Sequence, residues 1–232
     1  MKIMSFNTQH CRSYTTLKID YQVMADAILQ CGADRVALKE MRGQGEAEGY
    51  EPQMEILSGL TGMKHAYFAE AIQVNGRNPY GNGLLSRWKI ESARTYLVPD
   101  PVNGNGPFCY ETRCLLKAKL ENGLTVLVIH FGLNPDEQEN AVRTVLEHLE
   151  KQRCILMGDF NVLPDDPVLA PIRARMKDAA QAFPSPRLSF PSDQPDRKID
   201  YIFVSPDIEV VSADIPAIVA SDHRPHVAQI RV

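Results

Sequence analysis

The chain alternates short apolar runs with loops rich in glycine, proline and asparagine. The runs have the length and the Val, Ile, Leu and Phe content of β-strands. They read KIMSFN, DRVALKE, HAYFAEAI, GLLSRWKI, TRCLLKAKL, LTVLVIHFG, RCILMGDFN, KIDYIFVS, IEVVSADI and HVAQIRV. Several are apolar at both odd and even positions, as is typical of strands that are covered on both faces.

Three segments are expected to be helical. Apolar side chains recur at helical spacing in segments 18–31 and 135–151, and a third helix is expected over much of 51–60. The second segment also begins with helix-start signals, because Asn134 can cap and Pro135 suits the first helical position. Since strands and helices interleave without repeats, the pattern predicts two packed sheets.

Composition adds that this is an ordinary soluble chain with a real core. It has 232 residues, 44% of them hydrophobic, and a formal charge of −4. With no break in composition, we expect a single α/β domain over residues 1–232. No long basic run is present, which argues against a protein that relies on bulk attraction to nucleic acid phosphates.

The cysteines and the start of the chain favour a cytoplasmic location. The five cysteines are an odd number without a CxxC pair, so reduced thiols are the simpler interpretation. The first residues run straight into a strand-like segment without the features of a leader. Nowhere do eighteen apolar residues follow one another, so no stable membrane association is expected.

Polar residues interrupt the apolar runs where the strands end. Those at the carboxyl ends are Asn7, Glu40, His130, Asp159 and Asn161, and Asp200 stands near the start of another run. The two-residue period places each on a face with apolar residues, for example Glu40 with Val36 and Leu38. Burying such a group without a partner costs about a few kcal/mol. We therefore expect these residues to converge or to hold a metal.

The stretch SDHRPH places Asp222 and His223 just before the last strand. Chain ends carry little chemistry unless something ties them down. The stretch makes sense if the last strand lies inside a sheet and these two residues sit where it begins.

Each polar residue taken alone also has a purely structural interpretation. Glu40 can be a strand-end carboxylate that meets a lysine, and His130 can be a satisfied core histidine. Asp200 can pair with Arg197 or Lys198, GDFN can be a turn, and Asp222 can be a cap. These interpretations do not account for the whole set.

The segments SFN, KE, YGNGLLSR, IHFG, GDFN, KIDYIFVS and SDHRPH follow one another in this order between residues 5 and 226. In that order they resemble the endonuclease/exonuclease/phosphatase superfamily. The resemblance implies a four-layer α/β/β/α sandwich of two mainly antiparallel mixed sheets flanked by helices.

The resemblance also implies a metal site. Glu40 matches the principal carboxylate ligand of a Mg²⁺ ion, with Asn7 beside it and Asp222 in the ligand shell or just outside it. Mn²⁺ is a possible substitute. Mg²⁺ suits a sparse protein ligand set because it keeps several waters and binds substrate phosphate oxygens.

The remaining matches imply contacts to a phosphate. His223 matches the histidine that acts as base or as stabiliser of the transition state, with Asp200 holding its ring. Asp159 is expected to orient or deprotonate the attacking water. Asn161 would hold a phosphate oxygen and His130 would contact the phosphate, with Asn82 as its frequent partner.

Several positions are ambiguous or depart from the family pattern. Arg113 can pair with phosphate or form a strand-end salt bridge with Glu111. Lys39 stands where glutamine is frequent and points either toward the site or away from it. Ile129 replaces a common threonine, and His226 occupies a usually apolar position.

These matches imply a Mg²⁺-dependent phosphoesterase that hydrolyses a phosphodiester or phosphomonoester by in-line attack of water. A monomer acting on a small soluble substrate is favoured, because basic side chains are scattered and Trp88 is expected in a core strand. A nuclease is the alternative within the same class. A catalytically silent module that binds a phosphorylated ligand is the alternative from a different class.

Overall fold

The computed structural model describes all 232 residues and contains two six-stranded β-sheets. The first sheet has the order β11-β12-β1-β2-β4-β3, formed by β1 (Lys2–Asn7), β2 (Arg35–Arg42), β3 (His65–Val74), β4 (Asn78–Ser86), β11 (Glu209–Asp214) and β12 (His226–Arg231). The second has the order β5-β6-β7-β8-β10-β9, formed by β5 (Ile90–Leu97), β6 (Cys114–Leu120), β7 (Thr125–His130), β8 (Cys154–Asp159), β9 (Lys177–Asp178) and β10 (Asp200–Val204).

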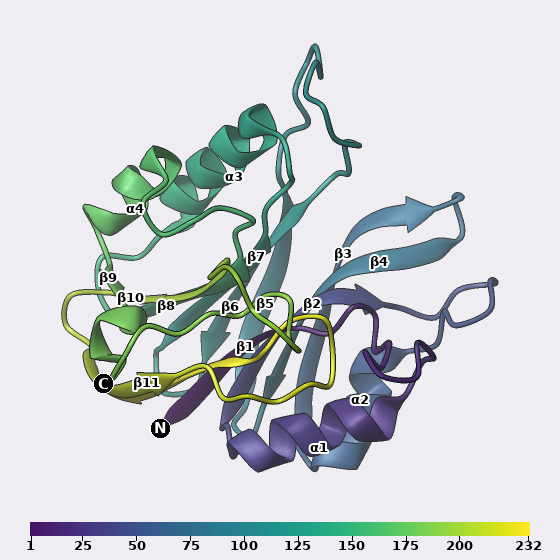
Figure 1. Cartoon of the computed structure of the whole chain (residues 1–232), viewed down its shortest axis with the longest axis horizontal. Helices are drawn as coiled ribbons and strands as arrows, with labels where there is room; N and C mark the ends of the chain where they lie inside the picture. The colour runs from purple at the N-terminus through teal and green to yellow at the C-terminus, as the bar shows by residue number, and fades with distance from the viewer.

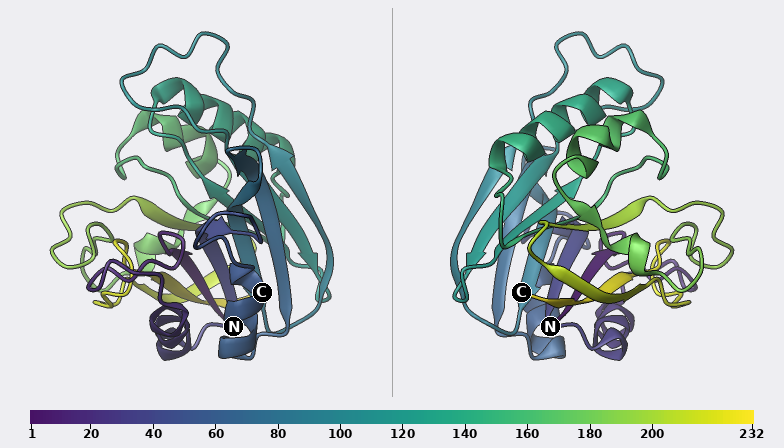
Figure 2. Two further views of the ribbon diagram at one scale, coloured as in Figure 1. Left: turned by 90° about the vertical axis from the view of Figure 1, so that its right-hand side faces the viewer. Right: turned by 90° about the vertical axis from the view of Figure 1, so that its left-hand side faces the viewer.

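Helices cover the outer face of each sheet (Figures 1 and 2). They are α1 (Tyr21–Cys31), α2 (Gln53–Thr61), α3 (Pro135–His148) and α4 (Ala170–Arg173), with short 3₁₀ helices at Pro167–Leu169 and Ala179–Ala182. No helix combines the length and the apolar character that crossing a bilayer requires.

The two sheets have the same internal plan. Each contains one parallel pair, β1 with β2 and β7 with β8, while all other neighbours are antiparallel. The prediction of mainly antiparallel mixed sheets is confirmed. The parallel pairs matter for function, because parallel neighbours end at the same edge of a sheet.

Three apolar clusters separate the four layers. One fills the space between the sheets and includes Ile3, Val128 and Ile202. A second joins the first sheet to α1 and α2, and a third joins the second sheet to α3 and α4. Figure 1 shows the two pairs of helices on opposite sides of the stacked sheets. The predicted α/β/β/α order of layers is therefore confirmed.

The last strand lies inside the first sheet, as expected from the SDHRPH stretch. β12 pairs with β11 on one side and with β1 on the other. The amino group of Met1 donates a 2.8 Å hydrogen bond to the backbone oxygen of Ile230, so both ends of the chain are tied into this sheet. The entry loop of β12 is held by two 2.7 Å backbone hydrogen bonds, from Ser192 N–H to the oxygen of Asp222 and from Arg224 N–H to the oxygen of Ser189.

The start of α3 has the expected capping pattern. Pro135 is the first helical residue, and the Glu137 carboxylate accepts a 3.1 Å hydrogen bond from the backbone N–H of Asn134. This contact satisfies a donor that has no partner within the helix.

Two sequence-based boundaries are wrong. The run at 83–90 is not one strand, because β4 ends at Ser86 and β5 begins at Ile90. Trp88 lies between them, is 40% exposed and stacks against the Arg35 guanidinium, so it is not a core residue. Segment 74–83 has the glycine, proline and asparagine content of the loops, yet most of it belongs to β4, because its residues pair with β2 and β3.

A β-bulge in β2 changes where Glu40 points. Val36 and Leu38 face α1 and α2, so simple alternation would place Glu40 on that outer face. The pairing of β2 with β4 instead shifts between Leu38 and Met41, and Glu40 has a left-handed φ of 59°. The bulge turns the carboxylate toward the end of β1. The parity expected for Glu40 is therefore wrong.

The YGNG sequence of β4 supplies the partner of this bulge. Gly81 and Gly83 pair with the residues on either side of the bulge, leaving Asn82 opposite the extra residues. A Cβ at Gly81 would collide with the backbone oxygen of Ala69 on β3. The glycine is therefore required for the close approach of the strands.

We expect Gly81→Ala to lower the free energy of unfolding by about 1–3 kcal/mol, because the collision is with backbone that cannot move freely. The matched control is Gly59→Ala in α2, where an added Cβ meets nothing within 4 Å. That change should raise stability by about 0.5–1 kcal/mol. Urea denaturation of both variants measures the difference, and equal effects would contradict the role assigned to Gly81.

Candidate active site

The predicted residues converge at the edge where the two parallel pairs end. In the first sheet Asn7 lies opposite Lys39, and in the second His130 lies opposite Asp159. Asp200 at the start of antiparallel β10 also lies opposite Asp159. The strand ends of both sheets thus bring polar side chains into one buried region.

The amide of Asn7 connects the two sheets. Its Nδ2 donates hydrogen bonds of 2.9 Å to Oε1 of Glu40 and 3.0 Å to Oδ2 of Asp159. Its Oδ1 accepts a 3.1 Å bond from the backbone N–H of Gln9, which fixes the orientation of the amide. One neutral donor therefore holds two carboxylates in place without adding charge.

His223 is held by a buried carboxylate. Its Nδ1 donates a 2.8 Å hydrogen bond to Oδ2 of Asp200, and its Nε2 lies 3.5 Å from Oδ2 of Asp159. The ring of Phe190 packs against the imidazole with a centroid separation of 4.8 Å. Asp200 and His223 are almost fully buried, so water screens their interaction little.

Charge determines the protonation of His223. Burial alone lowers its pKa, but the charges of Asp200 and Asp159 outweigh burial and raise the pKa to about 10. Burial opposes ionisation of Asp200, but the charge and hydrogen bond of His223, together with Lys39 and Ser189, outweigh burial and lower its pKa. At neutral pH the pair is an imidazolium and a carboxylate.

His130 has the opposite protonation state. Burial, followed by the positive charges of Arg113 and His223, lowers its pKa well below the usual value, so the ring is neutral. Nη1 of Arg113 lies 3.3 Å from Nδ1 of His130, and a guanidinium can only donate. Nδ1 therefore accepts, and the ring proton is assigned to Nε2. Nδ2 of Asn161 lies 3.2 Å from that Nε2.

The two carboxylates beside Asn7 favour a cation. Burial, followed for Glu40 by the nearby charge of Asp222, raises the pKa of Glu40, and burial likewise raises the pKa of Asp159. The Asn7 amide donates a hydrogen bond to each carboxylate and so bridges Glu40 and Asp159. A buried, acid-rich oxygen set with one amide is the donor chemistry that suits Mg²⁺ or Mn²⁺, so the residues fit such an ion.

A second group of potential ligands consists of Asp159, Asp200 and His223, whose ligand atoms lie within 4.8 Å of one another. His223 and Asp200, however, already satisfy each other as an ion pair. A protonated imidazole cannot bind a metal. The Glu40 end of the site is therefore the better candidate metal position, with Asp159 between the two.

The other predicted residues lie at the margin of this group. Oδ1 of Asp222 accepts a 2.9 Å hydrogen bond from the Ser221 hydroxyl. Asn82 donates to the backbone oxygen of Cys114, at 3.0 Å, rather than to a side chain of the site. Arg113 forms the predicted salt bridge with Glu111, and its Nη1 also contacts His130; the predicted pairing with phosphate stays a prediction.

The structure adds residues that sequence reasoning left out or left undecided. Lys39 points into the space between the sheets, donates a 2.7 Å hydrogen bond to Ser5 and lies 4.0 Å from Oδ1 of Asp200. Tyr80 also lies near Glu40. Burial, and then the charge of Glu40, raises the pKa of the Tyr80 hydroxyl. His10 also lies beside Glu40, and its only sequence signal is its place just after β1.

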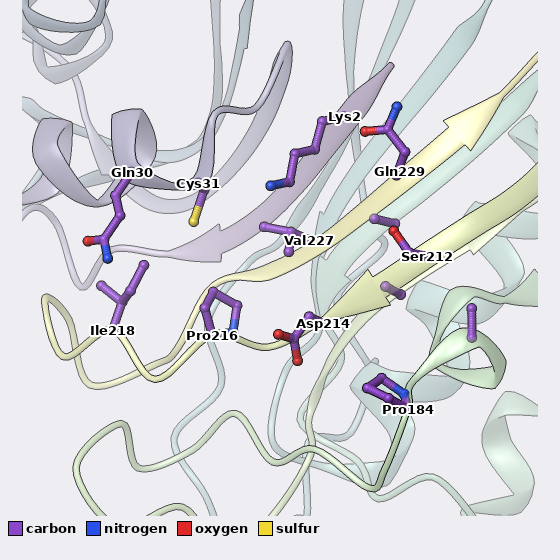
Figure 3. A pocket seen from close by; sticks show the side chains of 13 residues that line it. Lys2, Gln30, Cys31, Pro184, Ser212, Asp214, Pro216, Ile218, Val227 and Gln229 are labelled. Atoms are coloured by element: carbon purple, nitrogen blue, oxygen red, sulfur yellow. The ribbon is translucent and has the colours of Figure 1, made fainter.

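A hollow of about 450 Å³ lies elsewhere on the molecule, along β11, β12 and the end of α1 (Figure 3). Lys2, Gln30 and Asp214 supply polar atoms to it. Asp214 is already paired with Arg187, and none of the residues described above lines the hollow. The chemistry is therefore concentrated at the strand ends.

Comparison with known proteins agrees with this geometry. Residues 4–223 match the model of the Endonuclease/Exonuclease/phosphatase family, and the chain belongs to that family. No curated protein matches the chain.

Solved structures share the fold over the whole chain. An endonuclease/exonuclease/phosphatase from Beutenbergia cavernae is 21% identical with a TM-score of 0.78, and the alignment covers 100% of this chain and 71% of that one. A protein of the same description from Bacteroides vulgatus is 18% identical with a TM-score of 0.78 and coverages of 100% and 98%. The mannosyl-6-phosphatase Bt3783 of Bacteroides thetaiotaomicron is 14% identical with a TM-score of 0.78, and both chains are covered completely.

The contacts of Asn7 predict a pH-dependent variant. Asn7→Asp replaces a donor between Glu40 and Asp159 with a third carboxylate, and we expect a loss of about 2–4 kcal/mol in unfolding free energy at pH 8 without metal. The pKa values of Glu40 and Asp159 are already raised, so the folded state takes up protons at higher pH than the unfolded chain. The loss relative to wild type should therefore shrink as pH falls toward about 5.

Thermal and urea denaturation in EDTA between pH 5 and 8 measures this dependence. The control is Asn75→Asp, because Asn75 is an exposed turn residue that takes no part in the site. That variant should change stability by less than about 0.5 kcal/mol. A loss in Asn7→Asp that does not vary with pH would contradict the arrangement.

Proposed function

We propose that this protein is a divalent-cation-dependent phosphoesterase that acts on a small soluble phosphoester by in-line attack of water. The observation that carries the proposal is the pairing of an imidazolium, His223, with an acid-rich oxygen site around Glu40: His223 lies 3.5 Å from Asp159, and Asn7 links Asp159 to Glu40. A phosphoryl group between them would meet the imidazolium on one side and a bound cation on the other. A bound Mg²⁺ or Mn²⁺ would neutralise charge on the phosphoryl oxygens.

His223 would act as a charge stabiliser. Because its pKa is about 10, the ring is already protonated at neutral pH and is a poor base. Its Nε2–H can donate to an oxygen on which negative charge develops in the transition state. Asp200 holds the ring in the orientation that directs Nε2 toward Asp159.

Asp159 would take the proton of the attacking water. Burial raises its pKa from the ordinary aspartate value, which brings it closer to the range in which a carboxylate is an effective general base. Asn7 holds Oδ2, and the backbone N–H of Asn161 holds Oδ1 at 3.0 Å. The carboxylate is therefore oriented before substrate enters.

His130 and Asn161 would receive a phosphoryl oxygen. With its proton on Nε2, His130 presents a donor 3.2 Å from the Nδ2 donor of Asn161. Two donors that face each other lack a common acceptor, and an anionic oxygen would supply it. Arg113, on the far side of the imidazole, adds positive charge and holds the tautomer.

The surface supports a small substrate rather than a nucleic acid. The chain has a net charge of −4, and four of its surface arginines are paired with carboxylates, in Arg77–Glu46, Arg187–Asp214, Arg197–Asp196 and Arg231–Glu209. A nucleic-acid strand needs several free cations along its backbone. One structural relative, which matches over its full length, is named a mannosyl-6-phosphatase, and this agrees with the preference.

Hydrolysis of bis(p-nitrophenyl) phosphate, p-nitrophenyl phosphate, a hexose 6-phosphate and a supercoiled plasmid, each with Mg²⁺, Mn²⁺ or EDTA, tests the proposal. We expect turnover of a small ester that EDTA abolishes. Glu40→Ala and His223→Ala should each lower kcat/KM by about 100-fold or more, because each removes charge stabilisation of the transition state.

The matched controls are Glu139→Ala, an exposed glutamate of α3, and His65→Ala on β3, which should leave kcat/KM unchanged within about twofold. Preferential cleavage of the plasmid would instead identify a nuclease. A folded protein that hydrolyses none of the four and gains no activity with either cation would support a silent phosphate-binding module.

A further inference from the structure

His10 is the histidine of the site whose ring has no hydrogen-bonding partner. Its Nδ1 lies 3.9 Å from Oε2 of Glu40, beyond hydrogen-bond distance, and its side chain is 23% exposed. Oε1 of the same carboxylate is taken by Asn7. Nδ1 of His10 and Oε2 of Glu40 form no hydrogen bond with each other, and their side chains are partly exposed, at 23% and 21%, with Tyr80 the other protein group beside the carboxylate.

The backbone that presents His10 is strained. Gln9, His10 and Cys11 all have left-handed φ angles, 47°, 48° and 62°. This conformation costs an L-residue about 1–2 kcal/mol, and only surrounding structure that fixes it can maintain it. Three consecutive left-handed residues give the side chain of the middle residue, His10, a different direction from the one it would have in a right-handed turn.

Buried Gln53 supplies that fixation. Its Nε2 donates a 2.8 Å hydrogen bond to the backbone oxygen of His10, and its Oε1 accepts a 2.9 Å bond from the backbone N–H of Arg42. Arg42 follows the bulge that carries Glu40 by two residues. One fully buried amide thus sets the position of the His10 turn relative to the Glu40 bulge.

We propose that His10 is a metal ligand together with Glu40, and that its imidazole gives the site a preference for Mn²⁺ or Zn²⁺ over Mg²⁺. This inference rests on the proposed function, since it concerns the cation of that site. Two ligand atoms of one ion are about 3.0–3.4 Å apart, so a small movement of either side chain from the present 3.9 Å would let one ion contact both Nδ1 and Oε2.

The ligand chemistry explains the preference. Mg²⁺ takes oxygen ligands and water, whereas imidazole nitrogen strengthens binding of transition-type cations.

Binding of Mn²⁺ to the substrate-free protein tests the proposal without reference to turnover. Electron paramagnetic resonance titration gives the Mn²⁺ affinity, pulsed measurements detect coupling to a directly bound ¹⁴N, and calorimetry gives the Mg²⁺ affinity. The variant is His10→Gly, because glycine adopts the left-handed backbone freely. His10→Asn, which also tolerates that backbone, is the second variant, and His65→Ala is the matched control.

We expect both His10 variants to lose the ¹⁴N coupling and to bind Mn²⁺ about tenfold or more weakly, with Mg²⁺ affinity changed by less than about threefold. His65→Ala should bind as wild type does. Retained ¹⁴N coupling in folded His10→Gly, or an equal loss of Mg²⁺ and Mn²⁺ affinity, would overturn the assignment. Because substrate is absent, a negative hydrolysis assay would count against the proposed function and leave this result unaffected.

Discussion

Between the two sheets, the imidazole of His223 and the carboxylate of Asp200 share a 2.8 Å hydrogen bond in a place that water barely reaches. Removing two such charges from water costs several kcal/mol each, and only close pairing offsets that cost. The pair in turn sets the state of its neighbours. It keeps His223 cationic, which helps to hold His130 neutral. The contrast between the two histidines therefore follows from the carboxylates beside His223 and from the burial and the Arg113 charge that act on His130.

The fold makes this pair possible by ending two parallel strand pairs at the same place. Asn7 and Asp159 come from different sheets and still form a direct 3.0 Å hydrogen bond. Because each sheet is covered outside by helices and inside by the other sheet, these strand ends are rigid. The charged groups are therefore oriented before any ligand arrives, which is what electrostatic stabilisation of a transition state requires.

The sequence predicted the fold and most of the converging residues because strand parity is local. His130 and Asp159 lie in line with apolar neighbours that fill the space between the sheets, as alternation indicates. The same rule failed for Glu40, whose position depends on a bulge formed with β4. The same rule could not predict the role of His10. Its position depends on a strained turn that Gln53, distant in sequence, holds in place, and such a turn produces no periodic pattern in the sequence.

The most direct test of this account is the protonation state of His223, followed by ¹⁵N NMR of its ring in the metal-free protein between pH 6 and 10.5. The account predicts that both ring nitrogens stay protonated at pH 8 and that the ring titrates near pH 10. In Asp200→Asn, the ring should titrate about two or more pH units lower, because the paired charge is gone. A wild-type His223 that is neutral at pH 8 would contradict the central role of the ion pair.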